Sequence, residues 1–364
     1  MNSWTQIPGP LVIAGSDCYE VLSKLVTSAR ALIISSPSVV KLDNFKKLCN
    51  TLDHIETKIF DQVTPNPTPE DIDGSFAELQ EFKPTYVIAV GGGSVIDFAK
   101  VISARLSNSD VRSATELINL EKFNPSPIKL VAIPTTSGTG SEMTPFATIW
   151  HKSGSGKASI ESPEIRPSIV VLDSDLGKSA SADQLLFSGL DAISHCVETL
   201  WNRNKNPVSE VYAVSGLKYM LASLPQVIAG IGTSKDFENT QIGAMFGGQA
   251  IAQNHTAIAH SISYPLTAFA GVPHGLACSF TIPAIFRNLY STSLNNSEIN
   301  QLLDDVVVYL DSLNLTQKVL TYCSRETITG YKNLFATQNR SKNFAIDIKP
   351  LELFNIIEIA FDVT

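Results

Sequence analysis

Short apolar runs alternate with helical patterns along the first half of the chain. Each run is continuously apolar, rich in β-branched residues and bounded by Gly, Pro or Ser, which is typical of buried strands. The runs are PLVIAG, ALIISS, TYVIAV, IKLVAIP and SIVVLD, and helical patterns at 18–29 and 95–106 lie between several of them. Because strands that are apolar throughout indicate a sheet covered on both faces, the pattern predicts a doubly wound α/β domain.

The second half of the chain is almost free of strand signals. Helical patterns cover 182–201, 208–229, 240–259 and 296–313. Ala and Gly recur in the run GAMFGGQAIAQ, which suits close packing between helices at some cost in helix propensity. We therefore expect an α/β domain at 1–178 and an all-α domain at 179–364.

Composition narrows the class of protein without naming a function. The chain has 364 residues, a net charge of −8 and a pI near 5.3. It therefore lacks the excess of positive charge with which proteins bind nucleic acid, and we do not expect a nucleic-acid-binding function. It has no apolar run of about 18 residues and no secretory leader pattern at its start, so we expect no membrane span. The five cysteines are scattered and never spaced CxxC, which favours reduced thiols and a cytoplasmic location.

A glycine turn follows the strand TYVIAV. Gly91, Gly92 and Gly93 allow positive φ and close approach to a ligand, and a helix starts near Ser94. Backbone N–H groups and the helix dipole would form an anion site there, suited to a pyrophosphate. The run matches neither GxGxxG nor the P-loop, so it does not identify the nucleotide, and a plain strand-to-helix turn is the alternative.

A second loop follows the strand IKLVAIP and reads TTSGTGSE. Its hydroxyls, which include those of Thr135, Thr136 and Thr139, and its backbone donors suit the ribose and diphosphate of a nicotinamide cofactor. The alternative is an ordinary loop rich in Ser and Thr.

One carboxylate and three imidazoles form a candidate metal site. Asp191 and His195 are four residues apart, so a helix places them on one face, and His260 and His274 follow later. The surrounding helix is apolar, and a cation would offset the cost of burying an unpaired carboxylate. This ligand set suits Fe(II) and also Zn(II), which binds such sites more tightly.

These motifs resemble those of a known family. GGGSVIDFAK, IPTTSGTGSE, SGLDAISHCVE and the spaced AH…PHG are similar, in the same order, to motifs of the iron-containing (group III) alcohol dehydrogenases, over about residues 10–290. The resemblance implies the dehydroquinate synthase-like fold, with a Rossmann-like N-terminal domain, a helical C-terminal domain and a catalytic cleft between them. It also implies a homodimer, and an iron ion held by Asp191, His195, His260 and His274.

The resemblance further implies which residues hold NAD(H) or NADP(H). They are Gly91, Gly92, Gly93, Ser94, Asp97, Thr135, Thr136 and Thr139, with Lys157 near the nicotinamide ribose. Two positions depart from many family members. Tyr264 replaces a histidine linked to proton transfer, so Tyr264, a ribose hydroxyl or water must relay the proton. Ser36 replaces an Asp that would accept the ribose 2′-hydroxyl of NAD, which permits NADP(H).

The expected reaction is hydride transfer between a nicotinamide and a small aldehyde or primary alcohol, with a metal polarising the oxygen. The run HSISYPL resembles subgroups that act on anionic aldehydes such as phosphonoacetaldehyde, and Arg203 and Lys205 could attract an anion or simply suit a helix end. Alternatives are a glycerol dehydrogenase-like or dehydroquinate synthase-like enzyme. A metal-dependent hydrolase, which would work without nicotinamide, is an alternative of another class.

Overall fold

The computed structural model describes residues 4–27, 30–120, 123–124, 127–150, 157–290, 297–335 and 339–362. Contacts divide the chain into two compact units, Pro8–Ala180 and Ser181–Thr364, and the described residues before Pro8 belong to the second unit. Within these ranges, no helix combines the length and the apolar character needed to cross a membrane.

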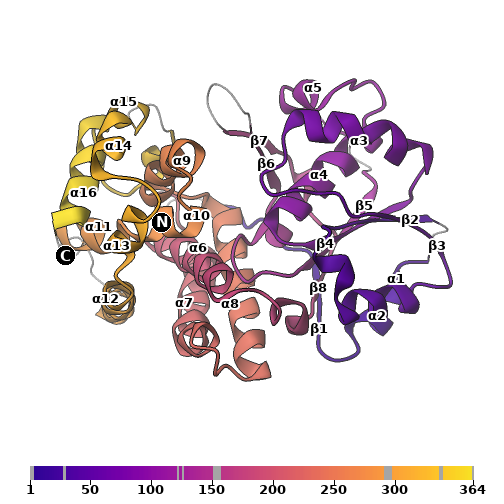
Figure 1. The fold of residues 1–364 in the computed structure, drawn as a ribbon, viewed down its shortest axis with the longest axis horizontal. Helices are drawn as coiled ribbons and strands as arrows, with labels where there is room; N and C mark the ends of the chain where they lie inside the picture. The colour runs from indigo at the N-terminus through magenta and orange to yellow at the C-terminus, as the bar shows by residue number, and fades with distance from the viewer. Residues whose placement is uncertain are drawn as a thin grey trace. The chain divides into compact units, whose positions relative to one another are not determined.

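The first unit is built on a six-stranded parallel sheet in the order β1-β8-β5-β4-β2-β3 (Figure 1). Its strands are β1 (Leu11–Ala14), β2 (Arg30–Ile34), β3 (Glu56–Phe60), β4 (Tyr86–Gly91), β5 (Lys129–Pro134) and β8 (Ile169–Leu172). Helices α1 (Cys18–Leu25) and α2 (Asp43–Thr51) cover one face, and α3 (Pro69–Glu81), α4 (Gly93–Ser107) and α5 (Ala114–Ile118) lie on the other. The expected α/β architecture is confirmed.

The strands that the sequence did not predict are those without a continuous apolar run. In β3, at the edge of the sheet, Phe60 is the one buried residue. Strands β6 (Phe146–Trp150) and β7 (Lys157–Glu161) pair with each other as an antiparallel hairpin outside the main sheet. Because a continuous apolar run was the signal used, the edge strand β1 (Leu11–Ala14) was found, whereas β3 and the hairpin strands escaped it.

The order of the strands fixes where a ligand can bind in this unit. The chain runs from β2 outward to β3, then returns to β4 on the other side of β2 and continues outward to β5. In parallel α/β sheets, ligands bind beyond the carboxyl ends of strands at such a reversal. The residues directly after β2 and β4 therefore occupy the position that the fold reserves for a ligand.

The second unit is helical, as expected. Its helices are α6 (Ala182–Leu200), α7 (Pro207–Ile228), α8 (Ser234–Asn254), α9 (Ile258–Ala270), α10 (His274–Ser279), α11 (Ile282–Ile285), α12 (Ser297–Ser312), α13 (Leu315–Leu320), α14 (Arg325–Gly330), α15 (Lys332–Phe335) and α16 (Pro350–Asp362). Local signals set several starts, since Ser181, Asn206 and Thr233 cap α6, α7 and α8 with their side chains.

The expected helix over 240–259 is wrong at both ends. Helix α8 begins at Ser234, behind a capping box formed by Thr233 and Asp236, and it ends at Asn254. His255 has φ +62°, in the left-handed region, and this residue breaks the helix. Helix α9 starts afresh at Ile258, so His260 lies in a first helical turn instead of following a helix end.

Glycines allow α6, α7 and α8 to pack closely. A Cβ added to Gly189 of α6 would lie 2.4 Å from Leu224 of α7, and one added to Gly247 of α8 would lie 3.2 Å from the carbonyl oxygen of Ala192 in α6. The close packing expected from GAMFGGQAIAQ is present, and α6 lies in tight contact with both α7 and α8.

Candidate metal centre

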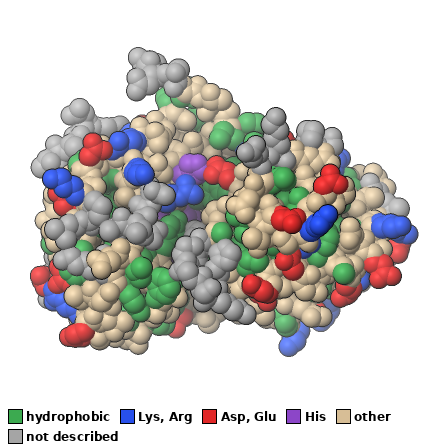
Figure 2. Space-filling view, turned by 90° about the horizontal axis from the view of Figure 1, so that it is seen from above, with side chains coloured by type: hydrophobic (Ala, Val, Ile, Leu, Met, Phe, Trp, Pro, Cys, Tyr) green, Lys and Arg blue, Asp and Glu red, His purple; other side chains and the backbone are tan. Residues whose placement is uncertain are grey.

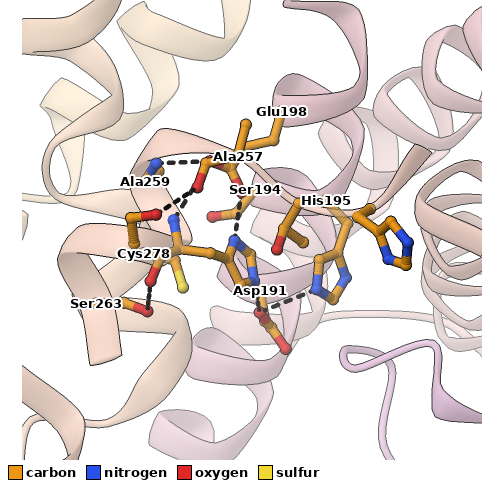
Figure 3. Close-up of polar contacts among 12 residues, drawn as sticks. Asp191, Ser194, His195, Glu198, Ala257, Ala259, Ser263 and Cys278 are labelled. Atoms are coloured by element: carbon orange, nitrogen blue, oxygen red, sulfur yellow. Dashed lines mark hydrogen bonds and ion pairs between the residues drawn. The ribbon is translucent and has the colours of Figure 1, made fainter. Parts of the chain in front are cut away.

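Helix α6 carries two of the predicted ligands on one face. Asp191 and His195 are separated by one turn and are each 4% exposed. Figure 3 shows their side chains pointing toward a common point, where side chains from α9 and α10 also arrive. The helical spacing that the sequence suggested therefore does place both groups on the same buried face.

All three predicted histidines converge on one oxygen atom of Asp191. Nε2 of His195 and Nε2 of His260 each lie 3.5 Å from Oδ1 of Asp191. Nε2 of His274 lies 3.8 Å from the same oxygen. Residues up to 83 positions apart in the sequence thus bring three imidazoles to one carboxylate oxygen, and the donor atoms of Asp191, His260 and His274 all lie within 4.8 Å of one another.

These distances fit ligands of a single ion better than they fit hydrogen bonds. Two N or O ligands about 2.1 Å from one ion, at the tetrahedral angle, lie about 3.4 Å apart. Oδ1 of Asp191 and Nε2 of His260 are buried and make no hydrogen bond. Because unpaired buried polar atoms are costly, the arrangement is that expected of a cation site.

The electrostatics of Asp191 agree with that interpretation. Burial alone would raise the pKa of this carboxyl, but positive charge on His195, His274 and His260 outweighs burial and lowers it. The carboxyl is therefore ionised and surrounded by groups that favour its negative form. A divalent cation at the same point would have the same effect on the carboxylate.

Glu198 is a residue of this centre that the sequence analysis missed. It lies three residues after His195 on the same face of α6 and is fully buried. Its Oε2 is 2.5 Å from Nδ1 of His260. A carboxylate on one ring nitrogen fixes the tautomer of the neutral ring, so that Nε2 of His260 would be available to an ion bound beside Asp191. The spacing Asp191, His195, Glu198 on one helical face was the signal available.

Glu198 also holds the start of α9. Its Oε1 accepts hydrogen bonds from the N–H groups of Ala259, at 2.5 Å, and His260, at 3.3 Å. The residue before α9, Ala257, offers no capping side chain, so the buried carboxylate of α6 takes that role. The backbone and the ring of His260 are thereby positioned by one group.

His274 reaches the centre because α10 lies against α6. A Cβ added to Gly275 would lie 1.9 Å from the carbonyl oxygen of Phe187, so only glycine fits there. Ser279 of α10 bonds to the Leu190 carbonyl oxygen and contacts the Ser194 hydroxyl, at 2.9 and 2.8 Å. This close approach makes Gly275 part of the site.

The predicted proton-relay residue lies beside His274. Tyr264 is half-buried, and its ring stacks on that of His274 at 6.1 Å with an angle of 3° between the planes. The side chain of His274 is 29% exposed, and histidine surface is visible on the face shown in Figure 2, next to basic side chains. Tyr264 therefore lies next to the most exposed of the four candidate ligands.

In the α/β unit, the two predicted cofactor loops touch each other. A Cβ on Gly93 would lie 2.6 Å from the side chain of Thr139, and one on Gly92 would lie 3.4 Å from Thr136. The N–H of Thr135 donates to the carbonyl oxygen of Gly91. Both loops follow adjacent strands, β4 and β5, and so meet at the same edge of the sheet.

The reason for the three glycines differs from the expected one. Gly91, Gly92 and Gly93 do not have positive φ, which occurs instead at Gly140, with φ +61°. A Cβ on Gly91 would meet Val95 at 2.5 Å, so close approach of the first turn of α4 is what requires glycine. The expectation of left-handed backbone at these three glycines was wrong, and close approach of a ligand to them stays a prediction.

The remaining predicted cofactor residues have defined places. Ser36 follows β2 and lies 3.2 Å from Ser38, hydroxyl to hydroxyl, while Ser94 accepts from the N–H of Asn66. Asp97 accepts from the Ser141 hydroxyl and the Thr148 N–H. Lys157 begins β7, and its side chain lies outside the described residues. Asp97 is thus engaged in holding the segment after the second loop.

Comparisons with known proteins agree with these observations. The model of the family "iron-containing alcohol dehydrogenase" matches residues 10–174, and that of the C-terminal part of the same family matches residues 185–360. The chain belongs to the iron-containing alcohol dehydrogenase family. The family resemblance inferred from the motifs is confirmed.

Similar proteins within this family include reductases and dehydrogenases. Phosphonoacetaldehyde reductase of Streptomyces viridochromogenes is 32% identical over 225 residues, covering 60% of this chain and 57% of that protein. An alcohol dehydrogenase of Thermococcus barophilus is 30% identical over 270 residues, covering 71% and 69%. The crystal structure of an iron-containing alcohol dehydrogenase of Thermotoga maritima superposes with a TM-score of 0.84 at 27% identity, covering 99% and 100% of the two chains.

Proposed function

We propose that this chain is a metal-dependent dehydrogenase that transfers hydride between NADP(H) or NAD(H) and a small aldehyde or primary alcohol. The observation that supports it most directly is the convergence of three imidazole Nε2 atoms within 3.8 Å of one buried carboxylate oxygen. Family membership supports the reaction class, because the matching models are those of alcohol dehydrogenases.

The proposed ligands are Asp191, His195, His260 and His274. Their two unpaired buried donor atoms and their spacing fit an ion, and the mixed N and O set suits iron or zinc. A bound ion of this kind supplies Lewis-acid polarisation of a carbonyl or alcohol oxygen. The chain contributes orientation: Glu198 fixes the tautomer of His260, and burial keeps bulk water from most of the donor atoms.

The cofactor is proposed to bind at the edge of the sheet where β2 and β4 end. The pyrophosphate would lie on the N–H groups at the start of α4, beside Gly92 and Gly93, with the Thr136 and Thr139 hydroxyls next to them. Ser36, at the end of β2, leaves no carboxylate to repel a 2′-phosphate, so NADP(H) is permitted alongside NAD(H). We propose Lys157 as a contact to the nicotinamide ribose.

The substrate class is proposed to be small anionic aldehydes such as phosphonoacetaldehyde. The similar reductase of Streptomyces viridochromogenes supports this class. Arg203 and Lys205 do not, because each is paired with a carboxylate, Arg203 with Asp347 at 2.5 Å and Lys205 with Glu210 at 3.1 Å. These ion pairs favour the alternative given for both residues, a helix end that cations suit. A homodimer and a cytoplasmic location stay predictions.

The decisive experiment combines metal analysis with an aldehyde panel. The purified protein is assayed with phosphonate, carboxylate and neutral aldehydes, with NADPH and with NADH, and its metal content is measured. His260→Ala should lose bound metal and turnover, whereas His54→Ala, which removes an exposed histidine of the other unit, should keep both. Turnover without change in nicotinamide absorbance, or full activity in His260→Ala, would refute the proposal.

A further inference from the structure

A fully buried lysine lies in α4, the helix that follows the glycine turn. The side chain of Lys100 is 0% exposed. Its ammonium group donates to the Ser141 hydroxyl at 2.9 Å, the Thr144 hydroxyl at 3.1 Å and the Phe146 carbonyl oxygen at 2.6 Å. An ammonium has three N–H donors, so each of them has an acceptor in one short segment, 141–146. Burial lowers the pKa of Lys100 to about 8, so the group carries its charge at neutral pH.

Asp97, one turn earlier on α4, holds the same part of the chain. Its carboxylate accepts from the Ser141 hydroxyl and from the N–H of Thr148, and it lies 3.8 Å from Nζ of Lys100. The short 3-10 helix that begins at Ser141 follows Gly140, which has no side chain with which to cap it. Two neighbouring side chains of α4 therefore fix the start of a segment that lacks a local cap.

The segment 141–146 joins two parts of the proposed cofactor site. Thr139 lies directly before it, and the hairpin of β6 and β7, in which β7 begins with Lys157, follows it. The start of α4 approaches Thr139, because a Cβ on Gly93 would lie 2.6 Å from that side chain. Further along, the same helix contacts the hairpin through the bond from the Thr148 N–H to Asp97. Helix α4 thus supports the loop before the segment, the segment itself and the hairpin after it.

We propose that Lys100 is a positioning residue for the nicotinamide half of the cofactor, an inference that rests on the dehydrogenase function proposed above. Because its side chain is fully buried, Lys100 acts through the segment 141–146 and not by touching the cofactor. A buried charge is costly, and an apolar side chain would fill the same space at less cost. What the charge contributes is order: it fixes three acceptors of one segment, and a preordered segment loses less entropy when a ligand binds.

Arg105 provides a matched control on the same helix. It is 4% exposed, and its guanidinium group pairs with Asp73 at 2.6 Å and donates to the carbonyl oxygen of Arg112 at 2.8 Å. Asp73 belongs to α3 and Arg112 precedes α5, so neither partner belongs to the cofactor loops or to the segment between them. Lys100→Met and Arg105→Met each remove one buried cation from α4, but only the first releases the segment 141–146.

The test measures binding of NADPH, NADH and ADP to the full-length protein by isothermal titration calorimetry, together with kcat and KM. ADP carries a pyrophosphate but lacks the nicotinamide and its ribose, so it reports on the start of α4. In Lys100→Met we expect the Kd of the nicotinamide cofactor to rise about tenfold or more, the change that follows the loss of one well-placed hydrogen bond. Turnover should fall by up to roughly 10²-fold, the effect of a misplaced reactant. ADP affinity should stay near the native value, and Arg105→Met should bind all three ligands normally.

Thr144→Val gives a second reading if Lys100→Met does not fold. It removes one acceptor of the ammonium and keeps the cation, so we expect a smaller rise in the Kd of the nicotinamide cofactor. Native cofactor affinity in the folded variants of Lys100 and Thr144, an equal loss of ADP affinity, or the same loss in Arg105→Met would overturn the role of Lys100 and leave the proposed dehydrogenase intact. A native protein that binds neither NADPH nor NADH would overturn both.

Discussion

The carboxylate of Glu198 lies 2.5 Å from Nδ1 of His260 and so decides which nitrogen of that ring faces Asp191. The same carboxylate accepts from the first N–H groups of α9. One buried side chain of α6 therefore orients a proposed ligand both through its ring and through the backbone that carries it. Such outer partners commonly tune metal affinity as strongly as they tune geometry.

We expect Glu198→Gln to weaken metal binding by roughly 10–100-fold while the helices stay folded. The amide keeps the shape of the carboxylate but loses the charge that sets the tautomer of His260. Competition with a metal chelator measures the change, and circular dichroism checks the fold. Glu210→Gln, which alters a partly exposed ion pair with Lys205, is the control. Equal metal affinity in the Glu198 variant and the native protein would show that the contact is only structural.

Gly275→Ala should remove metal without changing a ligand. The added Cβ would overlap the carbonyl oxygen of Phe187 at 1.9 Å, and because that atom is backbone, α10 has to move and carry His274 with it. We expect the free energy of unfolding to fall by about 1–3 kcal/mol and bound metal to decrease. Gly330→Ala is the control, since no atom lies within 4 Å of its added Cβ and its stability should hold or rise slightly. Denaturant unfolding and metal analysis of both variants test this.

Glu142 should make the α/β unit lose stability as pH rises from acid to neutral. Burial raises the pKa of Glu142 from 4.5 to about 7. The folded chain therefore holds a proton that the unfolded chain releases, so the stability is fully present below 4.5 and is lost as pH rises through about 7. The difference corresponds to about 3 kcal/mol.

Glu142→Gln should flatten that part of the stability profile, because the amide does not titrate. Chemical unfolding measured at several pH values across this window compares the variant with the native protein, and exposed Glu20→Gln serves as the control for loss of one charge. The nearby Lys100, whose pKa burial lowers to about 8, acts in a higher pH range and is present in both proteins. A profile that stays equally steep in the Glu142 variant would contradict the expectation.

Tyr264→Phe tests the proton relay. The ring that stacks on His274 is kept and only the hydroxyl is lost, so metal content should not change. If the hydroxyl carries the proton, kcat should fall by roughly 10²–10⁴-fold, and the solvent isotope effect on kcat should change. Unchanged kcat would assign proton transfer to a ribose hydroxyl or to water.

Particular residues show how far the sequence alone could lead. Strands that are buried on both faces were predicted because their apolar runs are unbroken, whereas β3, with Phe60 as its one buried residue, gave no such signal. The break at His255 could not be foreseen, because no Gly or Pro marks it and its left-handed backbone emerges only from packing.

The proposed ligands were predicted from the sequence, but the contacts that orient them were not. Asp191 and His195 stand out through helical spacing in an apolar context. Glu198 shares the helical face of Asp191 and His195, but only the approach of α9 to α6 shows that it contacts His260. The residue types that can bind an ion can thus be predicted from the sequence, whereas the orientation of their side chains depends on tertiary contacts.

The glycine contacts of α6 have a consequence for how this centre can change. Gly189 and Gly247 bring α6 into direct contact with α7 and α8. Movement of the helix that bears Asp191 and His195 would therefore require its neighbours to move as well. The segments opposite, α10 and the first turn of α9, hold one donor each and are likewise fixed to α6, α10 through Gly275 and α9 through Glu198. A designer who wishes to retune the chemistry should therefore exchange the side chains that face the centre and leave the helix contacts unchanged.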